Sequence, residues 1–229
     1  PSLIKDPYIY KADSLMLDLE DAVAANQKDS ARFSLYHALT TIDYRGSEKV
    51  VRINGLDTDL WKEDIRCCVA GGAEVIRIPK TEDAGMVKAV EDEIMKAEKE
   101  FHRPEGSTLI MSALESAKGV MNAYEVCTSS ERMIGVALSG GDYTKDLQTR
   151  ITGTGVELMG ARQHMIIAAR AAGVQCFDTV WTNLDDMEGF KNDVQTIFMM
   201  GFDGKSCINP RQIDVVHKIF TPTQKDIIF

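Results

Sequence analysis

Short apolar runs alternate with longer amphipathic segments along the chain, and this alternation limits the possible folds more than any other feature. Each run is nearly continuous in apolar residues and is bounded by Gly, Pro, Asp or Asn. That pattern is typical of strands that are covered on both faces. The seven predicted strands are Ser14–Asp18, Val50–Asn54, Val75–Lys80, Thr108–Glu115, Met133–Ser139, Cys176–Trp181 and Gly204–Asn209.

The segments between these runs repeat apolar residues at helical spacing. A strand followed by a helix, seven times over, predicts a parallel sheet with crossover helices, which is an α/β fold. The seven predicted helices are Ser30–Thr41, Leu60–Ala70, Thr81–Phe101, Gly119–Thr128, Gly155–Ala172, Asp186–Met200 and Gln212–Phe220.

Seven strand–helix units are one fewer than a closed (β/α)8 TIM barrel contains. The chain has 229 residues, 44% of them hydrophobic, which suits one barrel domain over residues 1–229. Segment Pro1–Tyr10 is typical of a helix that follows a strand, so we expect the first barrel strand to precede Pro1. The alternative is an open doubly wound sheet. Such a sheet usually carries a glycine-rich phosphate loop, and neither GxGxxG nor GxxxxGK[ST] occurs here.

Charge, hydropathy and cysteine pattern exclude several classes of protein. The net charge is −9, whereas a protein built to bind nucleic acid over much of its surface would be basic. No run of 18 apolar residues occurs, and the first ten residues lack the pattern of a signal peptide. Five cysteines without a Cys-x-x-Cys pair are typical of buried, reduced thiols. We therefore expect a cytoplasmic protein with no membrane or nucleic-acid partner.

Two carboxylates follow very apolar strands and are the best candidates for metal ligands. Glu115 ends the fourth run and Asp142 follows the fifth. In a barrel the active site lies at the C-terminal ends of the strands, where burial of an unpaired carboxylate would be costly. Carboxylate oxygens suit Mg²⁺, and the four histidines show no zinc spacing. The other interpretation, that both carboxylates cap helices or form ion pairs, stays open.

Charged residues also end the first three strands. Arg52 alternates with apolar neighbours, and a buried arginine needs an anion. That anion is either a substrate carboxylate or a structural partner among Asp18, Glu20 and Asp21, and both can hold together. Asp18 and Glu20 lie on one side of an extended segment and could serve acid–base chemistry or cap the next helix. For Lys80, phosphate contact or ion pairing is favoured over a Schiff base.

At these motifs the chain resembles the HpcH/HpaI aldolase and citrate lyase superfamily, and within it the citrate lyase β subunits. The resemblance covers essentially the whole chain, and the motifs LDLEDAV and GFDGKSxINPRQID are quite specific. The matching segments are Ala12–Val23, Lys28–Phe33, Val50–Asn54, Gly71–Thr81, Gly106–Gly119, Glu131–Tyr143, Ala168–Thr179, Gly201–Asp214 and Phe220–Lys225.

The resemblance implies a (β/α)8 barrel with Mg²⁺ that cleaves a citryl thioester to oxaloacetate and an acetyl thioester. The metal ligands of the family fall on Glu115 and Asp142, and its substrate-binding arginine falls on Arg52. The general base is not identified, and Asp18 and Glu20 are catalytic candidates.

The resemblance also implies partners and further contacts. We expect Lys80, Asn209 and Pro210 to contact the substrate. The thioester carrier is an acyl carrier protein, in a complex with citrate lyase α and γ subunits, or coenzyme A in a stand-alone enzyme. Barrels of this kind usually form trimers or hexamers, so a homo-oligomer is expected.

The chain departs from the family pattern at three places. Gly141 stands where a Glu usually precedes the metal Asp, Ala117-Lys118 replaces a common Pro-Leu, and the usual C-terminal lid would follow Phe229. A malyl-CoA or citramalyl-CoA lyase, or a related acyl-CoA enzyme of the same superfamily, is therefore the first alternative. A non-catalytic barrel subunit or binding module is the second.

Overall fold

The computed structural model describes residues 2–224 and forms one parallel sheet, whose strands are hydrogen-bonded in chain order from β1 to β7. In a doubly wound fold the strand order would instead reverse at a switch point inside the sheet, and this sheet has no such reversal among the described residues. The strands are β1 (Ser14–Asp18), β2 (Glu48–Arg52), β3 (Val75–Ile78), β4 (Leu109–Leu114), β5 (Met133–Leu138), β6 (Gln175–Asp178) and β7 (Gly204–Lys205).

Helices fill the connections between these strands. Three of them are short 3₁₀ turns, Pro7–Tyr10, Ala25–Gln27 and Val156–Leu158. Among the described residues, none of the helices is long and apolar enough to span a bilayer. The α-helices are α1 (Ser2–Lys5), α2 (Lys28–Thr41), α3 (Trp61–Gly71), α4 (Ala84–Glu100), α5 (Ala117–Met121), α6 (Ala123–Cys127), α7 (Gly140–Asp146), α8 (Met159–Ala172), α9 (Met187–Met200) and α10 (Pro210–Phe220).

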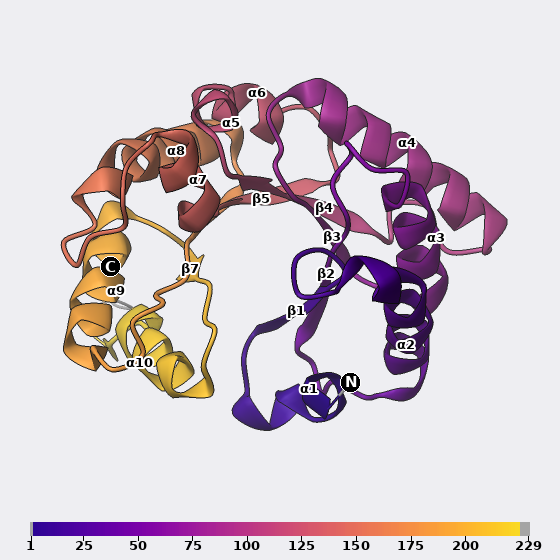
Figure 1. Cartoon of the computed structure of the whole chain (residues 1–229), viewed down its shortest axis with the longest axis horizontal. Coiled ribbons are helices and arrows are strands. Elements are labelled where there is room, and N and C mark those ends of the chain that lie inside the picture. The colour runs from indigo at the N-terminus through magenta and orange to yellow at the C-terminus, as the bar shows by residue number, and fades with distance from the viewer. Residues whose placement is uncertain (1, 225–229) are drawn as a thin grey trace.

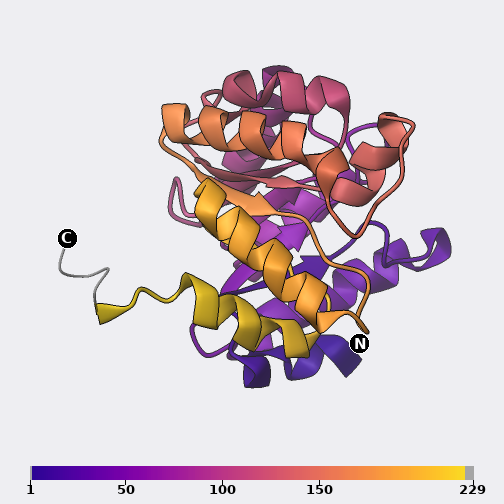
Figure 2. The same ribbon diagram turned by 90° about the vertical axis from the view of Figure 1, so that its left-hand side faces the viewer.

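The sheet curls into an arch with the strands on its inner side and most helices on its outer side (Figure 1). The arch is open between its two ends, where α1 and α10 approach each other (Figure 1). A side-chain contact of 2.9 Å joins the ends there, from His217 Nε2 on α10 to Asp13 Oδ2 before β1. Helices α9 and α10 lie side by side (Figure 2), and the rings of Phe198 and Phe220 meet between them at 5.3 Å.

Alternation along each strand divides the core in two. Outward side chains such as Val51, Ile76 and Val136 are fully buried against the helices. Inward side chains form a smaller cluster of Val50, Val75, Met111 and Ala137. Because the side chains of one strand point alternately to the two faces, the polar residues that continue the inward rows face the inside of the arch.

The alternation of seven strands and helices is confirmed, but several predicted bounds are wrong. The last two strands are shorter than predicted, since β6 ends at Asp178 and β7 at Lys205. The predicted helix Gly119–Thr128 is two helices, α5 and α6, which meet at Asn122. The side-chain amide of this residue donates to the Glu82 carbonyl oxygen at 2.8 Å, and its backbone angles are not helical.

Two further differences concern where helices begin and end. Helix α7 was not predicted, because its Gly140-Gly141 start is typical of a loop. The predicted helix Pro1–Tyr10 is interrupted at Asp6, since Pro7 has no N–H to continue the hydrogen-bond ladder. Pro1, Lys225 of the terminal motif and the segment expected after Phe229 lie outside the described residues.

Candidate active site

The structure brings both predicted metal ligands and Lys80 to one cavity, whereas the predicted substrate residues Arg52, Asn209 and Pro210 do not line it. This cavity has a volume of about 450 Å³. Lys80 and Glu115 line it after the ends of β3 and β4, and Asp142 lines it from α7, which follows β5. The other lining residues are Glu82, Ser116, Lys145 and Asp146. The structure therefore joins three residues that are far apart in the sequence.

Glu115 occupies the buried side of this cavity and is only 4% exposed. It accepts a hydrogen bond of 3.2 Å from the Ser139 hydroxyl. Burial raises the pKa of Glu115; a backbone N–H from Lys80 opposes this rise, and the nearby carboxylates Glu20 and Asp142 add to it. The N-cap of α5 is Ser116, so Glu115 has no capping role.

Asp142 lies in the first turn of α7 on the open side of the cavity. Its side chain is 39% exposed and forms an ion pair of 2.7 Å with Lys145, which is itself 78% exposed. Such a surface pair is weak, so it leaves the carboxylate able to take another partner. The predicted ion pair is thus present for Asp142, while no ion pair of the described residues involves Glu115.

Arg52 lies inside a group of carboxylates at the ends of β1 and β2. Its guanidinium donates to both oxygens of Asp18, at 2.8 and 2.6 Å, so the pair is bidentate. Its Nη1 lies 3.1 Å from Glu20 and 3.6 Å from Asp21. Burial opposes ionisation of Asp18, but hydrogen bonds from Arg52 and from the backbone N–H groups of Glu20 and Ala22 outweigh it and lower the pKa of Asp18.

Glu20 is buried between two cations. One is Arg52, and the other is Lys80, whose Nζ lies 3.1 Å from Glu20 Oε1. Lys80 has a left-handed backbone with φ of 49°, an uncommon conformation for a residue with a side chain that often marks a functional position. The hydrogen bond with Glu20 raises the pKa of Lys80, which is the opposite of what an amine nucleophile requires.

Arg77 is a buried arginine near the site that the sequence did not single out; it does not line the cavity itself. It occupies β3 beside Arg52 in the sheet register, and its side chain is almost fully buried at 7% exposure. Its Nη2 lies 3.4 Å from the Ser139 hydroxyl, and its Nε has no hydrogen-bond partner. Burial lowers the pKa of Arg77 to about 10. The signal in the sequence was an arginine alternating with apolar residues, the same signal that singled out Arg52.

The remaining predicted substrate residues lie at the start of α10. Asn209 is the N-cap of this helix, accepting from the Arg211 N–H at 3.0 Å, and it forms a capping box with Gln212. Pro210 is at the first helical position, where its missing N–H is harmless. Both residues thus have a structural role here, and their contact with substrate stays a prediction.

A second group of charged residues lies between the sheet and the outer helices. In this outer charge network, Arg162 of α8 forms a bidentate pair with Asp178 of β6, at 2.9 Å for both bonds. Arg162 also contacts Asp193 of α9 at 2.8 Å, and Lys205 of β7 lies between the two aspartates, 2.7 Å from Asp193. Lys205 and Asp178 have fully buried side chains, so the loss of either would leave a buried charge without its partner.

A neighbouring cavity of about 370 Å³ adjoins α7. Gly140 and Gly141 line one side of it, and Thr179 and Trp181 line the other. A side chain at Gly140 would come within about 3 Å of Thr179, whereas one at Gly141 would meet nothing within 4 Å. The structure therefore has room for a side chain at Gly141, beside Asp142.

The carboxylates fit a hard divalent cation with few protein ligands. Among the described residues, no three His, Cys, Asp or Glu side chains are close enough to surround one ion. Glu115 and Asp142 line the same cavity, and their mutual repulsion contributes to the raised pKa of Glu115. A cation would relieve that repulsion. Mg²⁺ commonly binds through one or two carboxylates and keeps its other positions for water and substrate.

Fold and site together define an α/β protein with a curled parallel sheet and an acidic pocket at the carboxyl ends of its strands. The chain belongs to the HpcH/HpaI aldolase/citrate lyase family, whose model matches residues 1–210.

Named relatives and a solved structure agree with this assignment. The chain is 55% identical over 227 residues to citrate lyase subunit beta of Leuconostoc mesenteroides subsp. cremoris, covering 99% of this chain and 75% of that protein. It is 45% identical over 226 residues to the subunit of the same name from Escherichia coli K12, with the same coverage. It also matches the citrate lyase beta subunit of Mycobacterium tuberculosis complexed with oxaloacetate and magnesium. That match has a TM-score of 0.75 and 28% identity, over 92% of this chain and 88% of that one.

Proposed function

We propose that this protein is a Mg²⁺-dependent carbon–carbon lyase that cleaves a citryl thioester to oxaloacetate and an acetyl thioester, as a citrate lyase β subunit. The observation that carries the proposal is the pair of Glu115 and Asp142 in one cavity at the carboxyl ends of the strands. The identity to citrate lyase β subunits over nearly the whole chain supports the substrate, and the complex of a related structure with oxaloacetate and magnesium supports the cofactor.

In this proposal, Glu115 and Asp142 hold the metal ion. When bound, Mg²⁺ supplies Lewis-acid stabilisation of the negative charge that develops as the carbon–carbon bond breaks. Arg52 is linked to Lys80 of this cavity through Glu20, and in this proposal it stabilises negative charge on the substrate. Asp18 holds the guanidinium of Arg52 in one orientation through its bidentate pair, so the orientation exists before the substrate binds.

For the general base we favour Glu20 over Asp18. Both oxygens of Asp18 accept hydrogen bonds, and its lowered pKa makes it a weak base. Glu20 is buried and lies 3.1 Å from both Arg52 Nη1 and Lys80 Nζ, without the bidentate pair that Asp18 makes. In this role Glu20 would take the proton of the substrate hydroxyl, and Lys80 would balance the change in charge.

The wider architecture and the partners are part of the same proposal. We infer that the curled sheet with its outer helices belongs to a (β/α)8 barrel, as a single domain, and that protomers assemble into trimers or hexamers. The carrier of the thioester is an acyl carrier protein in a complex with α and γ subunits, or coenzyme A.

Cleavage of three thioesters tests the proposed function. Citryl-CoA, malyl-CoA and citramalyl-CoA would be offered in parallel, with Mg²⁺ or with EDTA, and the released oxaloacetate, glyoxylate or pyruvate measured. We expect Mg²⁺-dependent oxaloacetate from citryl-CoA. A preference for malyl-CoA or citramalyl-CoA would show that the proposed substrate is wrong and leave the metal site unchanged. If none of the three thioesters is cleaved, and citryl acyl carrier protein is not cleaved either, the proposal is overturned.

A further inference from the structure

Arg77 differs from the other buried arginines of the described chain because no carboxylate forms an ion pair with it. Arg132 pairs with Glu98 at 2.7 Å, and Arg162 pairs with Asp178 at 2.9 Å. Arg77 has one contact, a long one of 3.4 Å to the Ser139 hydroxyl, and a buried Nε without a partner. The carboxylates Glu115, Asp18 and Glu20 act on Arg77 from beyond ion-pair distance, and burial outweighs them, so the pKa of Arg77 is lowered. A buried cation without a hydrogen-bonded anion is costly, so this position on β3 suits the carboxylate of a ligand.

The sheet register places Arg77 in the middle of the inward row. Asp18, Arg52 and Arg77 are successive partners across β1, β2 and β3, and Met111 of β4 follows them. Asp18 neutralises Arg52 on one side, while the apolar Met111 is the neighbour of Arg77 on the other. Of the two arginines in this row, Arg77 is the one that forms no ion pair with a carboxylate.

Ser139 connects Arg77 to the carboxylate pair. The hydroxyl of Ser139 lies 3.4 Å from Arg77 Nη2 and donates to Glu115 Oε1 at 3.2 Å. One hydroxyl group therefore separates the guanidinium from a carboxylate of the candidate metal site. A small diacid with one end at Glu115 and Asp142 would bring its other end toward Arg77.

We propose that Arg77 binds the second carboxylate of the substrate and so selects citryl thioesters over thioesters with one free carboxylate. The inference rests on the proposed function. A citryl thioester carries two free carboxylates, and so does the oxaloacetate that it releases, whereas a malyl thioester carries one. The metal site accounts for the first carboxylate, and a planar guanidinium suits the second because it can donate two parallel hydrogen bonds.

Burial makes this position selective. A buried guanidinium has already lost most of its water, so binding a carboxylate costs it little further desolvation. A ligand without that carboxylate leaves the guanidinium unpaired, and sites of this kind discriminate strongly between the two ligands. Because the free protein already bears the cost of the unpaired charge, Arg77→Met should fold with wild-type stability or better.

Binding of oxaloacetate and pyruvate in the presence of Mg²⁺ tests the role of Arg77. These acids share the α-oxo carboxylate and differ in the second one. We expect Arg77→Met to weaken oxaloacetate binding by about 10- to 100-fold, the effect of losing a charge-assisted pair, and pyruvate binding by less than about 3-fold. Arg77→Lys keeps the charge but cannot donate two parallel hydrogen bonds, so its affinity for oxaloacetate should lie between those of Arg77→Met and wild type. For citryl-CoA the loss should be in KM more than in kcat.

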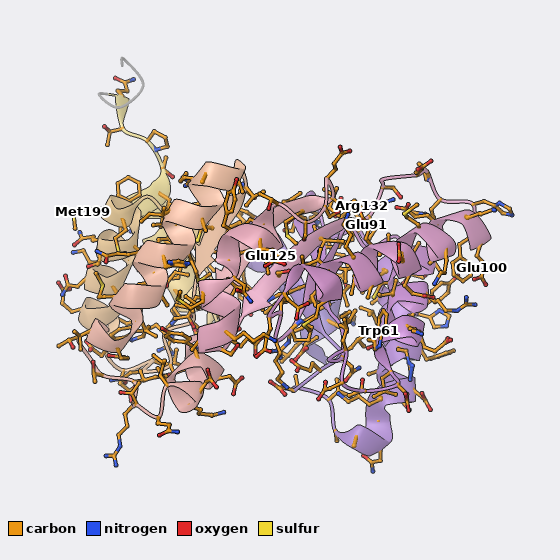
Figure 3. All side chains as sticks on the ribbon, turned by 90° about the horizontal axis from the view of Figure 1, so that it is seen from above. Trp61, Glu91, Glu100, Glu125, Arg132 and Met199 are labelled. Carbon is orange, nitrogen blue, oxygen red and sulfur yellow. The ribbon has the colours of Figure 1, made fainter. Side chains whose placement is uncertain are left out.

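Two other variants separate recognition from indirect effects. Ser139→Ala removes the hydroxyl beside Glu115 and should weaken Mg²⁺ and both acids alike. Arg132→Met breaks the pair with Glu98, far from the site and beside Glu91 in Figure 3, and should lower Tm without changing the ratio of the two affinities. An equal loss of both acids in Arg77→Met, or no loss, would overturn the assignment.

The proposed function fails by a different result, which is the absence of citryl thioester cleavage by the wild-type protein. If cleavage is present and the affinity ratio is unchanged in Arg77→Met, only the role of Arg77 is wrong. If wild-type protein with Mg²⁺ binds no oxaloacetate, both proposals are wrong.

Discussion

Two groups of buried charge lie on opposite faces of the same sheet and are balanced differently. In the outer charge network, between β6, β7, α8 and α9 (Figure 1), Arg162 and Lys205 face Asp178 and Asp193. Burial opposes the charged form there, but the opposite charges outweigh it, so the pKa of Asp193 is lowered and that of Arg162 is raised.

On the inner face, Asp18 and Lys80 are shifted toward their charged forms in the same way, but Glu115 and Arg77 are shifted in the opposite direction. Burial raises the pKa of Glu115 and lowers that of Arg77, so both groups are shifted toward their neutral forms. Buried charges that form ion pairs depend on each other for stability, whereas buried charges without an ion pair are candidates for binding a ligand of opposite charge. We infer that the residues at the carboxyl ends of β3 to β5 bind a ligand, whereas those at β6 and β7 have a structural role.

The largest expected effect is on the outer charge network. Lys205→Met leaves two buried aspartates with one cation, and removing one partner of a buried pair typically costs about 3–5 kcal/mol. We expect a large fall in the free energy of unfolding, measured with denaturant, and unchanged Mg²⁺ affinity in the molecules that fold. The matched control is Lys88→Met, which breaks an exposed pair with Glu91 and should cost at most about 0.5 kcal/mol. Equal effects of the two variants would show that the network contributes no more than a surface pair.

Glu115→Gln should have the next largest effect, on activity rather than stability. Losing a metal ligand removes about 3 kcal/mol or more of charge stabilisation, so turnover should fall at least ~100-fold, and Mg²⁺ binding by calorimetry should weaken. Glu125→Gln on α6 (Figure 3) is the control, because Glu125 is an exposed glutamate away from the cavity. Wild-type Mg²⁺ affinity in Glu115→Gln would remove this residue from the metal site.

A smaller effect is expected for Arg52→Lys. Lysine keeps the charge but cannot form the bidentate pair with Asp18, so its position should be less well defined. We expect kcat/KM to fall about 10-fold, close to 1.4 kcal/mol, with little change in Mg²⁺ affinity. An unchanged kcat/KM would mean that Arg52 has only a structural role.

The smallest effects are opposite shifts of stability with pH. The lowered pKa of Asp193 gives a stabilisation that is complete above its unfolded pKa, about 3.9, and is lost as pH falls through the folded value. Asp193→Asn should therefore lower Tm at neutral pH, with a difference from wild type that shrinks in acid.

Glu115 should show the reverse in metal-free protein. Its raised pKa means that ionisation costs stability above the folded pKa, a cost that disappears as pH falls below the unfolded value. Without metal, Glu115→Gln should raise Tm at neutral pH. A lower Tm of Glu115→Gln would show that the charge of Glu115 is balanced by its neighbours even without metal.

Patterns along the chain were sufficient for some of these residues. Glu115 was singled out as a metal candidate because burial of an unpaired carboxylate after an apolar strand is costly. The pattern alone left a capping or ion-pair role open, and the resemblance to a family favoured the metal. Arg77 gave the same signal as Arg52 and was not singled out, because one arginine in an apolar strand does not reveal whether a carboxylate lies opposite. Only the register, with Asp18 beside Arg52 and Met111 beside Arg77, distinguishes them.

The sequence by itself determined the order of strands and helices, the parallel sheet and the family, because hydrophobic periodicity and specific motifs are local properties of the chain. The tertiary structure alone decided which charges are balanced. Whether Lys205, Arg52 or Arg77 meets a carboxylate depends on which residues the curled sheet and its helices bring within a few ångströms, and the cost of burying a charge is set by those neighbours.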